Sequence, residues 1–204
     1  MTVLYRLDAN AADVAAQFGA TAGADPWNGG HVAPGSFAPV LTAGRDAIAG
    51  PGRADQPLRM IPRLWGVPPP GPPVDVRQGV LSVRNTKSPF WIGNLRNSEF
   101  RCLVPASAFM EWGAKDPANG KRRQHWLAPS DQLLFAFAGV WKDSEVPSFA
   151  LLACEPNAFL RERGIFAMPV ILPAGDAWRI WLRGEWNRAE ALVAPYASGM
   201  MREV

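Results

Sequence analysis

The chain has 204 residues, enough to bury one sizeable core, and we expect a single domain over residues 1–204. Hydrophobic residues make up 48%, and there are 20 prolines and 19 glycines, which excludes a disordered polymer and argues against an all-helical bundle. The formal charge of +3 comes from 17 arginines and 4 lysines against 18 acidic residues. The excess of arginine over lysine favours contacts with phosphate, but codon usage explains it equally well.

The cysteines and the apolar runs limit the kinds of site that the chain can carry. Cys102 and Cys154 lie inside apolar runs, with no CxxC spacing and no cluster of histidines. This pattern indicates buried thiols and predicts no disulfide framework, no metal and no other cofactor. The start of the chain does not read as a secretion signal, and no apolar run reaches membrane-spanning length. We expect a soluble, cytoplasmic protein that acts as a monomer, with no membrane partner.

The first third of the chain predicts one helix and short strands. Alanines and large apolar residues share one face of residues 8–18, which predicts a helix that Gly19 closes. Short apolar runs predict strands over residues 40–42 and 58–66. The second strand ends at Trp65, which we expect to be exposed or half-exposed and able to stack on a base of single-stranded nucleic acid. Ordinary core packing is the alternative for this tryptophan.

The stretch from residue 80 to residue 112 gathers most of the site-type side chains. Its apolar runs predict two buried strands, of which the first ends in Arg84 and Asn85 and the second leads to Glu111. If these strand ends adjoin, the anion-binding side chain of Arg84 would lie close to the acid/base group of Glu111. Such a pair would be a functional site on a rigid scaffold. The alternative for Glu111 is a structural ion pair with a nearby arginine.

The rest of the chain predicts more strands than helices. Residues 113–124 read as a basic loop that joins a hairpin, and its Lys121–Arg123 run either contacts phosphate or is simply solvated. Further strands are expected over residues 125–127, 133–141, 149–154 and 168–172, and short helices over 155–160, 174–182 and 185–196. Because strands and helices do not alternate regularly, the sequence predicts an α+β, mostly antiparallel, twisted β-barrel-like fold with flanking short helices.

Seven motifs, taken in order, resemble those of one known family. They are MTVLY, LWG, SVRNTKSPFW, RCLVPASAFMEW, FAGVW, ACEPN and MPVIL. Their order and spacing over most of the chain resemble the SRAP family, the SOS-response-associated peptidase-like proteins that trap abasic sites in single-stranded DNA. The resemblance implies a twisted β-barrel-like fold with flanking helices and a positively charged groove for single-stranded DNA.

The resemblance also implies a covalent chemistry. Members that this chain resembles carry a cysteine directly after the initiator methionine, and removal of that methionine frees an α-amine beside the thiol. The amine forms a Schiff base with the aldehyde of an opened abasic sugar, and the thiol then closes a stable thiazolidine ring. A glutamate is expected to handle protons, a histidine to help open the sugar, and an asparagine to hold the reacting group.

This sequence departs from that pattern at three of the four reactive positions. Thr2 stands where the cysteine is expected, Ser82 stands where the asparagine is expected, and residues 161–167 contain no histidine. The carboxylate remains, as Glu111. A hydroxyl is a far weaker nucleophile than a thiol near neutral pH, so the chain looks like a degenerate member whose crosslinking is slow, reversible or absent.

The resemblance and the motifs together give the expected site. The catalytic set is Thr2, Glu111 and Ser82, although a hydroxyl bonded to backbone is the alternative for Ser82. The residues expected to contact DNA are Arg84, Trp65, Gly66, Asn85, Trp112 and Pro34. Arginine would contact phosphate, and a tryptophan would stack on a base.

Two functions remain open on the sequence. The first is a protein that binds single-stranded DNA, with or without abasic sites, and whose crosslinking is weakened or lost. The second is a catalytically inactive scaffold whose groove serves a protein or small-molecule partner; a groove that is filled by a loop, neutral or acidic would favour it. A weaker third is a hydrolase that acts from an N-terminal threonine, with Glu111 as its base.

Overall fold

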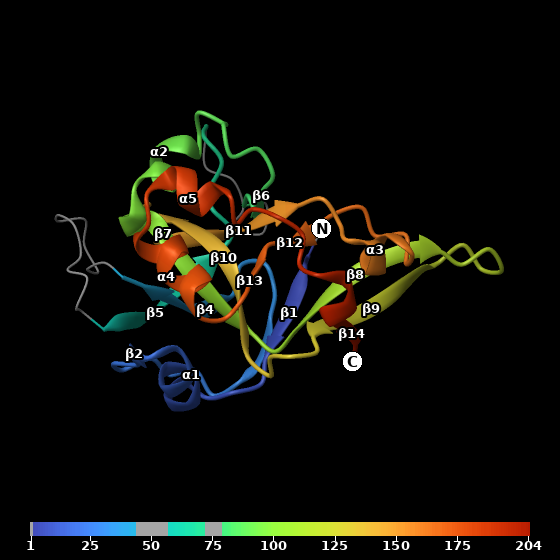
Figure 1. Ribbon diagram of the computed structural model, residues 1–204, viewed down its shortest axis with the longest axis horizontal. Helices are drawn as coiled ribbons and strands as arrows, with labels where there is room; N and C mark the ends of the chain where they lie inside the picture. Colours follow the sequence, from blue (N-terminus) through green and yellow to red (C-terminus); the bar gives the residue numbers. More distant parts are fainter. Residues whose placement is uncertain (1, 44–56, 72–78) are drawn as a thin grey trace.

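The computed structural model describes residues 2–43, 57–71 and 79–204 and shows an α+β protein in which strands dominate (Figure 1). The strands are β1 (Leu4–Leu7), β2 (Ala20–Thr21), β3 (Gly30–Val32), β4 (Phe37–Thr42), β5 (Leu58–Trp65), β6 (Ser82–Val83), β7 (Arg101–Ala106), β8 (Ala108–Lys115), β9 (Arg122–Pro129), β10 (Phe135–Lys142), β11 (Ser148–Cys154), β12 (Met168–Pro169), β13 (Ile171–Leu172) and β14 (Met201–Glu203). The helices are α1 (Ala11–Phe18), α2 (Ile92–Arg96), α3 (Ala158–Arg161), α4 (Asp176–Arg183) and α5 (Trp186–Glu190), with short 3₁₀ turns at η2 (Ser98–Phe100) and η3 (Ser198–Met200).

The centre of the molecule is a closed ring of strands. β10 pairs with β7, β7 with β4, β4 with β5, β5 with β11, and β11 returns to β10; only the β5–β11 pair is parallel. Alternate residues of β10 serve two cores, because Phe135 and Phe137 join one hydrophobic cluster whereas Ala136 and Ala138 join a second, which includes Trp181 of α4. The predicted mostly antiparallel, twisted barrel-like fold with short helices is confirmed.

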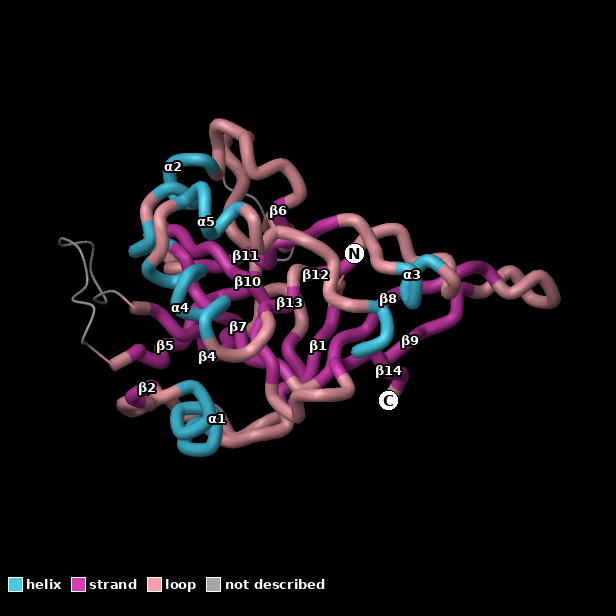
Figure 2. The backbone as a smooth tube through the Cα atoms, in the orientation of Figure 1, coloured by secondary structure: helices cyan, strands magenta, loops and turns pink. Residues whose placement is uncertain are grey.

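A second sheet, in the order β14-β9-β8-β1-β3, lies against this barrel. Tyr5 of β1, Phe109 of β8 and Leu127 of β9 belong to the same core cluster as Phe137 of the barrel, and the rings of Phe109 and Phe137 lie 5.7 Å apart, edge to face. Beyond this contact the β8–β9 hairpin projects from the body as an arm (Figures 1 and 2). The anchored end of the arm therefore holds the start of β1 against the middle of β8.

The helix predicted over residues 8–18 is observed as α1, which starts three residues later. Asn10 caps it, since its side-chain oxygen accepts a hydrogen bond of 2.9 Å from the backbone N–H of Asp13. Gly19 ends it in the left-handed conformation, with φ of 61°, as the sequence predicted.

The predicted last helix, over residues 185–196, is wrong beyond Glu190. α5 ends there, and residues 191–197 contain no helix; the backbone N–H of Val193 donates to the carbonyl of Glu190 at 3.0 Å. Pro195 disfavours the helical conformation in Ala194, so the helix could not run to residue 196 as predicted.

Trp65 is not the exposed platform that the sequence predicted. The residue is 0% exposed, because β5 is a strand of the closed ring and Trp65 belongs to the core cluster. Its indole N–H donates to the carbonyl of Leu81 at 3.1 Å, and its ring stacks against that of Phe149 at 6.4 Å. Gly66 is buried beside it with φ of 125° and donates its N–H to the carbonyl of Phe149 at 3.0 Å. A base cannot reach either residue in this structure.

The loop predicted over residues 113–124 is much shorter than expected. β8 continues to Lys115 and β9 starts at Arg122, and only the tip between them turns. The carboxylate of Asp116 closes that tip by accepting a hydrogen bond of 2.8 Å from the backbone N–H of Ala118. The predicted hairpin is confirmed. Its outer half carries no large apolar side chain, so it lacks the alternation by which a strand is recognised in a sequence.

Candidate functional site

The site is built where the start of β1 meets β8. Antiparallel pairing of Leu4 with Met110 brings the chain before β1 alongside Glu111. The hydroxyl of Thr2 donates a hydrogen bond of 2.5 Å to Oε1 of Glu111. Both side chains are buried, with exposed fractions of 5% for Thr2 and 0% for Glu111. Two residues of the predicted catalytic set, 109 positions apart, are thus in direct contact.

Burial sets the protonation of Glu111. Removal from water raises the pKa of this carboxyl above its usual value, and the hydrogen bond from Thr2 only partly opposes the rise. A carboxyl with a raised pKa keeps its proton at a higher pH than a surface glutamate does. Glu111 is therefore suited to giving and taking a proton beside the hydroxyl of Thr2.

Ser82 completes a small cavity beside this pair. β6 runs parallel to β11, with Ser82 opposite Leu151, and this places Ser82 in the same cavity wall as Thr2. Met168 and Pro169 of β12 form another wall. The cavity has a volume of about 10 Å³, which is the space of a single water molecule. The three predicted catalytic residues are thus gathered in one place, where only a very small group fits.

A larger open cavity of about 480 Å³ adjoins the small one. We call it the groove, and its lining residues are Arg84, Trp112, Arg122, Phe166 and Ala167. Ala167 lines both cavities, so the groove opens beside the Thr2 cavity. Trp112 is 37% exposed and Phe166 is 76% exposed, which presents two aromatic rings to solvent next to two guanidinium groups.

The charge of the groove is set by its arginines and one neighbouring carboxylate. Arg84 forms an ion pair of 3.3 Å with Glu155, and both side chains are largely exposed. Arg122 makes no ion pair within the described part of the chain. An exposed pair of this kind is weak, so a phosphate can compete with Glu155 for Arg84.

The structure brings some of the predicted DNA-contacting residues together and leaves others apart. Arg84 and Trp112 line the groove, whereas Trp65 and Gly66 are buried in the scaffold. Asn85 is exposed beside Arg84, but its side-chain oxygen accepts from the N–H of Lys87 at 3.0 Å and it does not line the groove. Pro34 is half-buried and also does not line it.

Sequence reasoning missed Phe166. It lies in the segment where the resemblance would place a histidine, a segment in which Ile165 is buried in the core and Ala167 lines the cavities. Nothing in the local pattern distinguishes an exposed phenylalanine from a core one. Arg122 belongs to the basic run that was predicted either to contact phosphate or to be solvated, and the structure places it in the groove wall.

Neither cysteine replaces the expected nucleophile. Burial raises the pKa of Cys102 strongly, and it raises the pKa of Cys154 to about 11, with the charge of Glu155 adding to the effect. Both thiols therefore stay protonated near neutral pH. Among the described residues, no three His, Cys, Asp or Glu side chains are grouped as a metal site requires. Over the same residues, no helix has the length and apolar character of a membrane span.

The fold and the site define a class: a barrel-like α+β protein that carries a small polar cavity at the rim and an arginine-lined aromatic groove next to it. A sequence model of the family described as SOS response associated peptidase (SRAP) matches residues 1–204. The chain belongs to this family, as the motifs predicted. A comparison with proteins of curated function found no significant match.

Crystal structures of similar fold support the architecture. A protein from Bacteroides thetaiotaomicron superposes with a TM-score of 0.76 at 17% identity, covering 98% of this chain and 90% of its own. A protein from Bordetella bronchiseptica gives a TM-score of 0.70 at 17% identity and covers 99% of both chains. A phage-related protein from the same organism gives 0.69 at 16% identity, covering 99% of this chain and 92% of its own. At these identities the likeness concerns the fold alone.

Proposed function

We propose that the protein binds single-stranded DNA in the groove, as part of the SOS response with which its family is associated. The observation that carries the proposal is the pairing of two exposed aromatic rings, Trp112 and Phe166, with two arginines around an open cavity of about 480 Å³. Single strands bind to surfaces of this kind, because any base can stack on an aromatic ring while arginine neutralises the backbone.

The openness of the groove suits a ligand that enters from solvent. The cavity is an open depression of about 480 Å³ and is not enclosed in the core, so part of a strand can enter it from outside. Ala167 lines both the groove and the small cavity that Thr2 and Ser82 line, where Thr2 is hydrogen-bonded to Glu111. A nucleotide in the groove would therefore have its sugar close to that cavity.

We further propose that covalent trapping of abasic sites is weakened in this chain. The hydroxyl of Thr2 is hydrogen-bonded to Glu111, which can take up its proton only weakly because a hydroxyl is far less acidic than a thiol. After removal of Met1, the amine of Thr2 could still condense with an aldehyde, but ring closure by a hydroxyl gives an oxazolidine that reopens readily. The expected product is a reversible adduct.

Binding of a fluorescent oligothymidine that carries no terminal phosphate, followed by anisotropy at several salt concentrations, tests the proposal. We expect the logarithm of the affinity to fall linearly with the logarithm of salt, by about 0.7 for each phosphate neutralised. Arg122→Ala should reduce that slope by about 0.7. Arg123→Ala is the matched control, since the next residue of β9 points to the opposite face of the arm and lies outside the groove.

The result also separates the two functions left open by the sequence. Salt-sensitive binding that Arg122→Ala weakens and Arg123→Ala leaves unchanged supports DNA binding in the groove. Absence of salt-sensitive binding would refute the proposal and favour a scaffold with a protein or small-molecule partner. Equal losses in both variants would show that the charge of the arm, and not the groove, attracts the oligonucleotide.

A further inference from the structure

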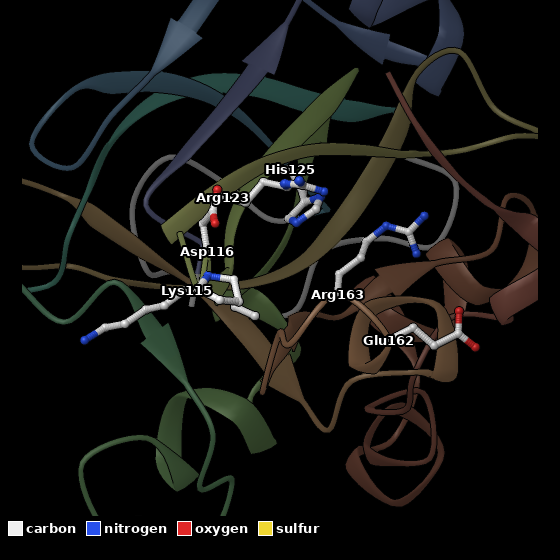
Figure 3. Close-up of a pocket in the computed structure, with 8 residues that line it drawn as sticks. Lys115, Asp116, Arg123, His125, Glu162 and Arg163 are labelled. Atoms are coloured by element: carbon white, nitrogen blue, oxygen red, sulfur yellow. The ribbon is translucent and has the colours of Figure 1, made fainter. Parts of the chain in front are cut away.

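A second polar cavity lies at the arm and shares no lining residue with the groove. We call it the rear pocket; its volume is about 310 Å³, and its charged and polar lining residues are Lys115, Asp116, Arg123, His125, Glu162 and Arg163 (Figure 3). Alternate residues of β9 separate the two cavities, since Arg122 lines the groove whereas Arg123 and His125 line the rear pocket. The proposed DNA site does not use any residue of the rear pocket.

His125 is the buried group that faces this pocket. Its side chain is 6% exposed, and Nδ1 lies 2.7 Å from Oε1 of Glu203. A carboxylate at Nδ1 fixes the proton on that nitrogen and leaves Nε2 directed elsewhere. Within the described residues Nε2 makes no hydrogen bond. A Cβ at Gly113 would lie 2.6 Å from Nε2, so only glycine leaves room for the ring at this position.

The carboxylate of Glu203 also orients a guanidinium at the pocket. Nε of Arg163 lies 3.2 Å from Oε2 of Glu203, and the first terminal nitrogen of Arg163 donates to the carbonyl of Phe159 at 2.7 Å. The hydrogen bond with His125 is the main cause that lowers the pKa of Glu203. Glu203 is thus an anion that already has two partners, His125 and Arg163. It lies on the Nδ1 side of the imidazole, away from Nε2.

The remaining charged residues of the pocket differ in whether they can reach a ligand beside His125. The carboxylate of Asp116 is engaged in the turn, where it accepts from Ala118 and from the side chain of Asn119. Lys115 and Glu162 extend to opposite sides of the pocket, both away from His125 (Figure 3). Arg123 makes no ion pair within the described part of the chain.

We propose that the rear pocket binds a phosphate group. Arg123 and the second terminal nitrogen of Arg163 supply charged donors, and His125 supplies Nε2, which shares one proton with a phosphate oxygen. With a phosphate dianion the imidazolium donates from Nε2, and Glu203 stabilises its charge from the other side. With the monoanion the phosphate hydroxyl donates to Nε2, and the total proton count is the same. Inorganic phosphate and a terminal phosphate of a nucleic acid share this chemistry.

Nuclear magnetic resonance of the imidazoles tests the site directly. The chain has two histidines, and His31 is exposed on β3, so its signal serves as an internal reference. Titration with inorganic phosphate, against chloride at equal ionic strength, should shift the His125 ring signals saturably and leave those of His31 unchanged. Arg123→Ala should weaken the phosphate affinity about tenfold or more, the effect of losing one charged hydrogen bond, while Arg122→Ala leaves it unchanged.

The source of the phosphate is distinguished by a second arm of the experiment. A 5′-phosphorylated oligothymidine that shifts His125, where its 5′-hydroxyl counterpart does not, identifies a strand terminus as ligand; a response to inorganic phosphate alone identifies the free ion. Either outcome supports the site. No saturable shift of His125 with either probe, or an unchanged phosphate affinity in Arg123→Ala, would overturn the proposal. Because the groove is monitored separately through Arg122→Ala, this failure is distinct from failure of DNA binding.

Discussion

Replacement of Phe166 by alanine tests the aromatic half of the groove. The ring is 76% exposed and lines the groove without joining the core, so its loss should change the free energy of unfolding by no more than about 0.5 kcal/mol. Stacking of a base on an aromatic side chain contributes about 1–3 kcal/mol, so the Kd for oligothymidine should rise about 5- to 150-fold. The salt slope should stay the same, since no phosphate contact is removed.

The matched control is Phe37→Ala. Phe37 is 55% exposed on β4 and lies outside the groove lining. Its replacement removes an exposed ring comparable to that of Phe166 and leaves the proposed site unchanged. Anisotropy titrations of both variants and the wild type, with thermal melts to check folding, give the answer. The reasoning fails if Phe166→Ala binds as tightly as the wild type, or if Phe37→Ala loses as much affinity.

Three further substitutions test the electrostatics and the packing. Glu155→Gln removes the carboxylate that pairs with Arg84 at 3.3 Å, and should tighten oligothymidine binding by up to about fivefold in anisotropy; weaker binding would contradict the competition. Glu111 has a pKa raised above 4.5 by burial, so the folded state holds its proton more tightly than the unfolded state and the wild type loses stability as pH rises above 4.5. Urea unfolding should therefore show that the free energy of unfolding of Glu111→Gln increases relative to that of the wild type as the pH rises. Parallel plots of the two free energies against pH would refute the raised pKa. Gly113→Ala places a Cβ 2.6 Å from a backbone carbonyl and should destabilise the fold by about 1–3 kcal/mol in the same assay, whereas Gly199→Ala, with nothing within 4 Å, should be neutral; equal stability of the two variants would contradict the packing.

The fold, and the presence of Thr2 and Glu111 in one site, could be predicted because the sequence patterns that indicate them are local or belong to family motifs. Apolar runs gave the barrel strands, and Asn10 and Gly19 bounded the first helix by capping and by left-handed conformation. The motif around Glu111 placed it in the site, and its contact with Thr2 followed from strand pairing that brings distant residues together.

The errors about exposed aromatic residues have one physical cause, which is that exposure depends on tertiary structure. Trp65 and Phe166 are both large aromatic residues near strand ends, yet the first is enclosed by the closed ring and the second is open to solvent. No local pattern separates them. The pairing of His125 with Glu203 was equally out of reach, since it joins residues 78 positions apart through β9 and β14.

The central claim is that the groove delivers a DNA sugar to the cavity of Thr2, where the expected sulfur is missing. Incubation with an abasic-site oligonucleotide, followed by a denaturing gel, tests it with the wild type beside Thr2→Cys, after mass spectrometry has shown that Met1 is absent from both. We predict a stable covalent band from Thr2→Cys and none from the wild type. A stable band of equal strength from the wild type, or no band from a Thr2→Cys protein that binds the oligonucleotide, would contradict the account.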